Sequence, residues 1–345
     1  MKGLRKYLTP FAPDQSGAVS VLYELGGIVV ICDAGGCTGN ICGFDEPRWH
    51  SHRSAVFSAG LRDMDAILGR DDKLVAELVD AAGKIEARFA AIIGTPVPSV
   101  IGTDYHALRR MTEKKVDLPI LTIDTTGMEL YDVGAEKAYL ALMRRFAREP
   151  MKTEPGRIGV FGVNPLDMSD LHASDRIRDL LLGAKCYGMG SGFDDVLAAA
   201  SAEKNIVAAP SGLRAAQYLE EKFGIPYEVY DPLAEVLLPD HNYSGKRILV
   251  IDQQIRANTM RDILLDRGAA NVHCATWFLM DTSRIKSGDC RLREEDDFEA
   301  LVYQGGYDML IGDPTLWRIV PNYTGETVDL PQFPVSGQLG GASLD

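Results

Sequence analysis

The sequence predicts an α/β protein built from parallel sheets that are covered by helices. Short apolar runs rich in β-branched residues alternate with amphipathic helical patterns along most of the 345 residues, which is typical of that fold class. Turn or charge signals, followed by a basic residue and a new apolar strand, lie near residue 150 and near residue 241. We therefore expect three domains, at residues 1–150, 151–243 and 244–345.

The expected strands are short apolar runs that end at glycine, proline or polar residues. They cover residues 28–32, 90–93, 120–124, 157–161, 205–209, 227–230, 247–252, 271–275 and 308–311. An apolar stripe through 71–89 predicts a helix, and Ser211 is expected to cap the start of another helix that ends at Gly224. After Pro314 the chain is rich in proline, glycine and polar residues, which indicates an extended C-terminal tail.

The composition argues against several classes of function. With 46% hydrophobic residues the chain can bury substantial cores, and a formal charge of −13 leaves no basic surplus for nucleic-acid phosphates. No apolar run approaches the ~20 residues that cross a bilayer, and the N-terminus has no continuous apolar signal core. We therefore expect a cytoplasmic protein that contacts neither nucleic acid nor membrane. Six cysteines are too few for a disulfide scaffold.

The segment after the first strand is the most informative one for chemistry. Cys32, Cys37 and Cys42 recur with four residues between neighbours, and ligands of open α/β sheets bind outside the carboxyl ends of strands. Thiolates favour iron–sulfur clusters or zinc, yet three packed thiols around a turn fit the spacing equally well. A phosphate-binding loop is disfavoured, because neither glycine fingerprint is present. The glycines that would let the loop backbone approach a ligand are Gly35, Gly36 and Gly39.

Four further polar residues near these cysteines could take part in chemistry. Asp33, His50 and His52 are candidate additional ligands, and together with Asp45 they are candidate proton donors. A His-x-His pair is also common on solvated or packed surfaces, so both interpretations of His50 and His52 stay open. No catalytic residue can be assigned from the sequence.

Several motifs carry a resemblance to a known family. In chain order they are SGAVSVLYELGGIVVICDAGGC from Ser16, GRDDKL from Gly69, GTPVPSVIGTDY from Gly94, GRIGVFGVNP from Gly156, NIVAAPSGLRAAQYLEEKFGIPY from Asn205 and GKRILVID from Gly245. In this order and spacing they resemble the nitrogenase component 1-type oxidoreductases, which include the catalytic subunits of nitrogenase and of dark-operative protochlorophyllide reductase. The resemblance implies three Rossmann-like domains with parallel sheets in a chelatase-like arrangement.

The sequence departs from this family at the positions that bind its larger clusters. Family subunits with a bridging cluster use three cysteines, and only the middle one is matched, by Cys37; the others would fall near residues 11–13 and at Val97. The cysteine that anchors the iron–molybdenum cofactor would fall at Ala209. The resemblance therefore implies that this chain has no iron–molybdenum cofactor and does not reduce dinitrogen.

A simpler cluster remains compatible with the resemblance. Some relatives bind one [4Fe–4S] cluster between two subunits, and here Cys37 with Cys42 or Cys32 from each chain would supply four thiolates. Asp33 is a further candidate ligand. A homodimer, or a heteromer with a sister component 1 subunit, is thus expected.

The resemblance leads to a specific functional expectation and to two alternatives. The chain would accept electrons from an ATP-dependent reductase resembling the nitrogenase iron protein and pass them, through an iron–sulfur cluster, to a small-molecule or tetrapyrrole-type substrate. Alternatively it would be a non-catalytic scaffold or carrier for a metal cluster or metallated cofactor. A cluster-free module that binds a small molecule is the third possibility, since fold alone does not determine function.

Overall fold

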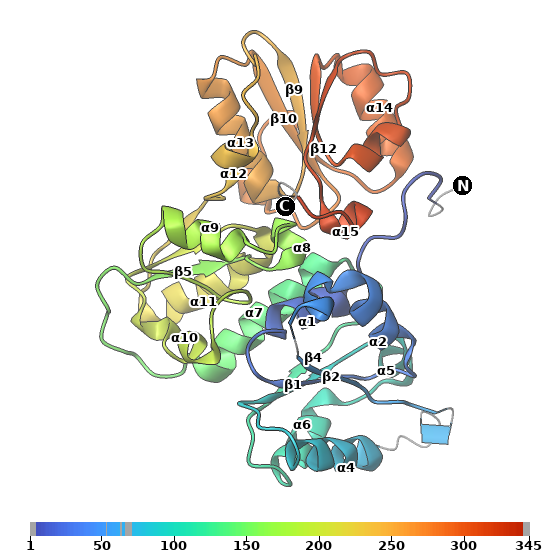
Figure 1. Ribbon diagram of the computed structural model, residues 1–345, viewed down its shortest axis with the longest axis vertical. Coiled ribbons are helices and arrows are strands. Elements are labelled where there is room, and N and C mark those ends of the chain that lie inside the picture. The colour runs from blue at the N-terminus through green and yellow to red at the C-terminus, as the bar shows by residue number, and fades with distance from the viewer. Residues whose placement is uncertain (1–4, 53, 63, 66–70, 341–345) are drawn as a thin grey trace.

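Three parallel sheets form the framework of the chain, which confirms the predicted α/β class (Figure 1). The computed structural model describes residues 5–52, 54–62, 64–65 and 71–340. Each sheet falls within one of the three predicted residue ranges, and the domain limits at 150 and 243 stay a prediction. Within the described residues, no helix is both long and apolar enough to cross a membrane.

The first sheet has the strand order β2-β1-β3-β4, and all of its pairs are parallel. Its strands are β1 (Ile28–Ile31), β2 (Ala55–Ser58), β3 (Ala90–Ile93) and β4 (Ile120–Ile123). Alternate side chains enter two different cores. Val29 and Ile31 face α1 (Asp14–Leu22) and α7 (Tyr131–Phe146), whereas Ile28 and Val30 pack with α4 (Asp71–Ala82) and α6 (Tyr105–Glu113). Both faces of this sheet are therefore buried, as expected for a parallel sheet.

The second and third sheets repeat this arrangement along the chain. The second has the order β6-β5-β7-β8 and the third β11-β10-β9-β12-β13. Their strands are β5 (Ile158–Phe161), β6 (Ala184–Cys186), β7 (Lys204–Val207), β8 (Tyr227–Val229), β9 (Arg247–Ile251), β10 (Asn271–Thr276), β11 (Cys290–Arg291), β12 (Met309–Gly312) and β13 (Glu326–Asp329). The other helices of eight or more residues are α9 (Ala173–Leu180), α11 (Leu213–Phe223), α13 (Gln254–Asp266) and α14 (Glu295–Gly305). The short helices are α2 (Gly36–Asn40), α5 (Pro96–Ile101), α8 (Pro165–Met168), α10 (Phe193–Leu197), α12 (Ala234–Leu237) and α15 (Phe333–Ser336).

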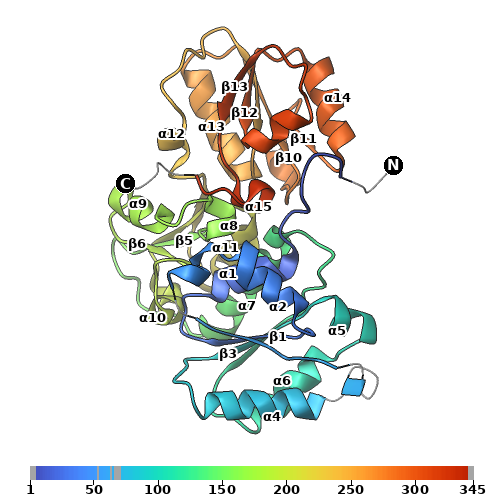
Figure 2. The same ribbon diagram turned by 45° about the vertical axis from the view of Figure 1, so that its right-hand side comes forward.

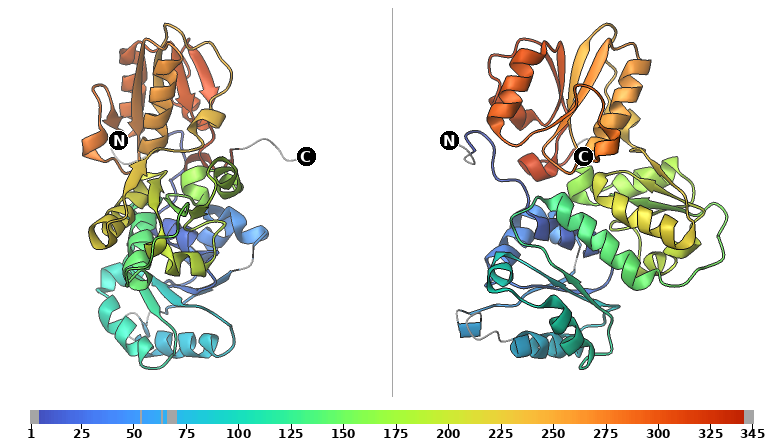
Figure 3. Two further views of the ribbon diagram at one scale, coloured as in Figure 1. Left: turned by 90° about the vertical axis from the view of Figure 1, so that its left-hand side faces the viewer. Right: turned by 180° about the vertical axis from the view of Figure 1, so that it is seen from behind.

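Two helices of the N-terminal region join the first sheet to the second. Seen from behind, α7 runs between the parts that carry these sheets (Figure 3), and it contacts β4 on one side and α11 on the other. The crossing of α1 and α7 depends on glycine, because a Cβ on Gly17 would collide with the Tyr131 carbonyl and one on Gly134 with the Asp14 carbonyl. All nine residues of α1 are buried, so the two backbones meet in the interior of the protein.

The prediction of an extended C-terminal tail was wrong. Residues after Pro314 form a 3₁₀ turn, the edge strand β13 and the helix α15, which contacts α8 (Figure 2). The Asp313 carboxylate accepts hydrogen bonds from the Gln332 N–H at 2.7 Å and the Ser336 hydroxyl at 2.6 Å. An edge strand can be largely exposed to solvent and then needs no apolar run, so the sequence did not predict β13. Only Val328 of its four residues is buried.

Two helix predictions also needed correction. The helix expected over 71–89 ends at Ala82, and Phe89 instead stacks on the Phe193 ring at a centroid distance of 5.2 Å. Ser211 does not cap α11; its hydroxyl donates to Asp167 at 2.7 Å. The end of that helix at Gly224 is confirmed, with a left-handed φ of 72° that favours glycine. The strands β2, β6 and β11 were not predicted. All three are short and lie at the edges of their sheets.

Candidate functional site

The cysteine-containing loop lies at the carboxyl end of β1, next to the centre of the first sheet. Gly35, with a φ of 112°, starts α2 in a conformation that side chains rarely adopt. The chain then continues through a π turn at Ile41–Asp45 and a 3₁₀ turn at Pro47–His50. The loop thus has defined secondary structure at the edge where open α/β sheets bind ligands.

Asp33 anchors the start of this loop. Its carboxylate accepts hydrogen bonds from the Thr38 N–H at 2.7 Å, the Thr38 hydroxyl at 3.0 Å and the Ser58 hydroxyl at 2.6 Å. The residue is 2% exposed. With its carboxylate oxygens engaged inside the chain, Asp33 acts here as a structural acceptor that holds α2 against β2.

The three cysteines do not lie in one place. Cys32 continues the alternation of Ile28 and Val30 and is buried in the core beneath α4 and α6, where burial first and Asp33 second raise the pKa of its thiol to about 12. Cys37 packs against the opposite core, and Cys37 and Cys42 are both half-buried. Burial raises the pKa of both thiols; Asp33 adds to the rise at Cys37, and Glu46 followed by Asp33 at Cys42.

A buried arginine holds the far end of the loop in place. Arg48 donates to both Glu46 oxygens at 2.7 Å and to Glu24 at 2.8 Å. It also donates to the Ser20 carbonyl at 2.6 Å and to the Gly188 carbonyl, at 3.2 Å, in the second sheet's region. Since a buried guanidinium needs such partners, Arg48 couples the loop to two distant parts of the chain.

His50 and His52 are exposed on the surface. No group of three His, Cys, Asp or Glu side chains gathers as a metal site anywhere in the described ranges. Within one chain, neither histidine, nor Asp33, nor Cys32 therefore completes a three-ligand metal site with Cys37 and Cys42. Gly36, Gly39 and Gly43 have open space where a Cβ would stand, so the loop backbone is accessible from outside the chain.

A groove of about 730 Å³ runs beside the loop. It is lined by residues 9–13, by Asn40 and residues 43–45 of the loop, by Gly127 and by residues 333–337 around α15. Phe44, which lines it, is 75% exposed. Residues 11–13, near which the family resemblance would place a further cysteine, line this groove.

A second polar cluster, which sequence reasoning missed, lies where the three sheets meet. Asp132 lies in the first turn of α7, Asp167 belongs to α8 and Asp252 follows β9. Burial first, and then these three carboxylates, raise the pKa of the buried Tyr131 hydroxyl. Burial raises the pKa of Asp132 and Asp252 to about 6 and that of Asp167 to about 7. One oxygen each of Asp167 and Asp252 lacks a hydrogen-bond donor among the described residues. We call these three residues the acid junction.

A buried arginine lies beside Asp252 of the acid junction. Arg256, 1% exposed, donates to Asp231 at 2.6 Å and lies 3.7 Å from Asp252. Asp252 could have been found from the sequence, because it ends a predicted strand. Nothing in the sequence places Asp132 or Asp167 beside it, since residues 132, 167 and 252 are far apart along the chain.

The comparisons with known proteins now identify the class. The model of the family "Nitrogenase component 1 type Oxidoreductase" matches residues 15–236. The chain belongs to this family of nitrogenase component 1-type oxidoreductases. The third sheet lies beyond the matched residues.

Two curated relatives share part of the sequence. The nitrogenase iron-molybdenum cofactor biosynthesis protein NifE of Clostridium pasteurianum is 28% identical over 181 residues, which are 50% of this chain and 38% of that protein. NifE of Bradyrhizobium diazoefficiens is 23% identical over 177 residues, 50% of this chain and 32% of that protein. The similarity thus spans about a third of the length of these relatives.

Solved nitrogenase structures share the fold over nearly the whole chain. "Nitrogenase Cp1 at pH 6.5" has a TM-score of 0.74 at 12% identity and covers 99% of this chain and 89% of that one. "Nitrogenase Cp1 at pH 5" has a TM-score of 0.71 at 15% identity and covers 96% and 85%. The third sheet is therefore similar in fold although its sequence lies outside the family match.

Proposed function

We propose that this chain is an electron-transferring subunit of a nitrogenase-like system. Two subunits would hold one [4Fe–4S] cluster between their loops, with Cys37 and Cys42 contributed by each. The assembly would accept electrons from an ATP-dependent iron-protein-like reductase and pass them to a small-molecule or tetrapyrrole-type substrate. The observation that carries the proposal is the pair of half-buried thiols on an open, glycine-rich loop in a member of this family.

The chemistry of the loop fits a metal cluster. Burial and the carboxylates of Asp33 and Glu46 raise the pKa of the thiols, so the thiolates lack compensating positive charge in the protein. Metal ions supply that charge and deprotonate coordinating thiols. The open space over Gly36, Gly39 and Gly43 would accommodate a group that belongs to two chains.

The ligand set that we propose is narrower than the sequence alone allowed. Cys32 lies in the core on the other face of the first sheet, and Asp33 is occupied by Thr38 and Ser58. We therefore leave both out, and His50 and His52 with them. One chain then provides two thiolates, and a cubane cluster that takes four needs a second subunit.

A bound cluster would store and pass on single electrons. The chain's own residues would hold and shield it: Arg48 and Asp33 fix the two ends of the loop, and Phe44 would exclude water from its rim. Phe44, Val100 and Met128 are 75%, 82% and 79% exposed. The partner subunit, either a copy of this chain or a sister component 1 subunit, would cover Phe44 together with the cluster.

A non-catalytic scaffold or carrier is the second candidate function. Both curated relatives are named for cofactor biosynthesis. Ala209, where the family resemblance would place the cofactor-anchoring cysteine, is fully buried and offers no ligand atom. In this alternative the same loop would hold a cluster that is handed on to another protein.

The test is an iron and acid-labile sulfide assay on anaerobically purified and reconstituted protein. We expect about four irons per dimer with a broad visible absorption band, lost in Cys37→Ala and in Cys42→Ala. Cys290→Ala is the matched control, because Cys290 is also half-buried but lies in the third sheet, and it should keep its iron. Equal iron in Cys37→Ala, or a colourless protein after reconstitution, would overturn the proposal.

A second measurement separates the two functions. The loaded protein is mixed with an iron-protein-like reductase, ATP and a tetrapyrrole substrate. Reduced product with the cluster retained supports the electron-transferring subunit. Loss of the cluster to an apo-acceptor protein, without product, supports the carrier.

A further inference from the structure

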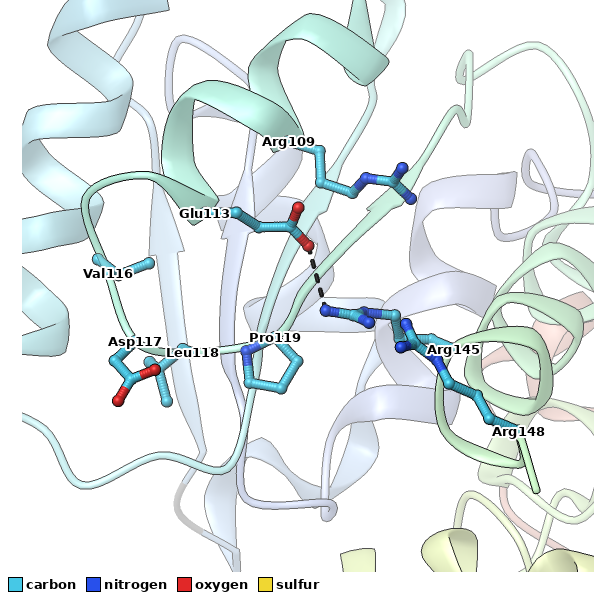
Figure 4. A pocket seen from close by; sticks show the side chains of 8 residues that line it. All are labelled: Arg109, Glu113, Val116, Asp117, Leu118, Pro119, Arg145 and Arg148. Atoms are coloured by element: carbon cyan, nitrogen blue, oxygen red, sulfur yellow. Dashed lines mark hydrogen bonds and ion pairs between the residues drawn. The ribbon is translucent and has the colours of Figure 1, made fainter.

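A basic groove lies at the open edge of the first sheet, away from the cysteine loop. It consists of two adjoining hollows of about 470 and 510 Å³, which share Arg109, Arg145 and Arg148. Figure 4 shows the side chains that line the first hollow. One wall is the edge strand β4 and another is the C-terminal half of α7. Volumes of this size are typical of small-molecule sites.

The charge of the groove is opposite to that of the protein. Its lining contains cationic side chains from three helices and the segment after α7, namely Arg109, Lys137, Arg144, Arg145, Arg148 and Arg214. The carboxylates in the lining are Glu113, Asp117 and Asp124. In a chain with a net charge of −13, this local positive surplus would attract anions.

Carboxylates of the chain neutralise only some of the cationic side chains in the groove. Arg145 pairs with Glu113 at 3.2 Å, Lys137 with Asp124 at 3.3 Å and Arg214 with Glu136 at 3.4 Å. Neither Arg109 nor Arg148 has an ion pair within the residues that the structure describes, and the buried Nε atoms of Arg109 and Arg145 have no acceptor. The guanidinium groups of Arg109 and Arg148 therefore carry positive charge that no carboxylate neutralises within the described residues.

The helix dipole does not explain the cluster. Cations are favoured in the last turn of a helix, which accounts for Arg144 and Arg145 at the end of α7. Arg109 belongs to α6 and Arg214 to α11. These two residues converge on the same space from other elements.

We propose that this groove binds a small polyanion that carries two or more phosphate or carboxylate groups. Planar guanidinium groups recognise both kinds of group through paired hydrogen bonds. Leu118, Pro119 and Leu140 provide apolar wall between the cations, which suits a compact organic body with anionic ends. The site is separate from the cysteine loop and does not depend on a cluster.

Calorimetric titration of the full chain at low ionic strength tests the proposal, with pyrophosphate and tricarballylate as probes. We expect saturable binding of one probe per chain, weakened at least tenfold in Arg109→Gln/Arg148→Gln and weakened by added salt. Arg110→Gln is the matched control, since Arg110 is exposed on the same helix and lies outside both hollows; its affinity should stay within twofold. Preference for pyrophosphate would indicate a phosphorylated ligand, and preference for tricarballylate a polycarboxylate.

Three outcomes would overturn the proposal. They are the absence of saturable binding with both probes, binding by the double variant as tight as by the unchanged protein, and binding of poly-glutamate without either small anion. The last result would assign the groove to an acidic protein partner. Circular dichroism of the double variant and of Arg148→Gln alone checks that the fold is retained.

Discussion

The cysteine loop and the acid junction are both polar clusters that follow the carboxyl ends of strands, but they differ in how they are assembled. The loop is local: Asp33 and its partner Thr38 are five residues apart, and Cys37 and Cys42 stay half-buried. The acid junction brings together Asp132, Asp167 and Asp252 from three parts of the chain, and all are buried. A half-buried thiol is available to a ligand from outside, whereas a fully buried carboxylate interacts mainly with its own protein.

Replacement of Arg256 should have the largest effect on stability and tests whether the acid junction depends on this cation. In Arg256→Met, Asp231 and Asp252 would stay buried without their positive partner, so we expect a loss of about 3–5 kcal/mol in the free energy of unfolding. Urea unfolding at pH 7 measures it. Arg267→Met is the control, because its pair with Glu235 lies at the surface at 3.6 Å and should contribute about 0–1 kcal/mol. Similar losses in both variants would contradict the interpretation.

The pH dependence of the free energy of unfolding should reveal the titration of Asp167. Burial raises its pKa to about 7 in the folded state from an ordinary value of 3.8, so the folded state binds the proton more tightly than the unfolded state. The resulting stabilisation is complete below about pH 4 and is lost as the pH rises to about 7.

Asp167→Asn removes this titration while keeping an acceptor for Asn164 and Ser211. As the pH rises from 5 to 8, the free energy of unfolding of the variant should increase by about 2–3 kcal/mol relative to that of the unchanged protein. Urea unfolding at several pH values gives the difference. A difference that is constant with pH would show that Asp167 does not titrate in this range. Asp194→Asn, at an exposed carboxylate, serves as the control.

Within the loop, the cysteines should separate into a core residue and two accessible ones. In metal-free protein, Cys32→Ser would bury a hydroxyl in the apolar core and cost about 1–3 kcal/mol. Cys37→Ser leaves a half-exposed hydroxyl and should cost under about 1 kcal/mol. Thermal unfolding in the presence of a chelator measures both. If Cys37→Ser cost more than Cys32→Ser, the two thiols would have been assigned to the wrong environments.

The smallest expected effect distinguishes two neighbouring glycines. Gly35→Ala forces a side chain into a φ of 112° and should destabilise the metal-free protein by about 1–2 kcal/mol. Gly36→Ala meets no atom within 4 Å and should be close to neutral. The same thermal unfolding measures them, and equal effects would mean that the start of α2 is not held in this conformation.

The interior strands could be predicted from the sequence because each carries its own signal. The runs at 90–93 and 247–251 are buried on both faces and therefore consist almost entirely of apolar residues. Edge elements lack that signal. Glu326–Asp329 pairs with β12 and is otherwise largely exposed, so its strand character comes from its neighbour and not from its own residues.

The candidate site likewise has features that the local sequence predicts and features that depend on tertiary contacts. By itself the sequence determined the loop, its glycines and the spacing of its cysteines, because residues a few positions apart stay close in any fold. Which face of the first sheet each thiol occupies depends on the tertiary structure, and only that structure decided that Cys32 is buried in one core whereas Cys37 stays half-buried against the core on the opposite face. The same holds for the acid junction and the basic groove, because tertiary packing brings their side chains together from several elements. Burial and long-range contact are properties of that packing, and neither is encoded at any single position of the chain.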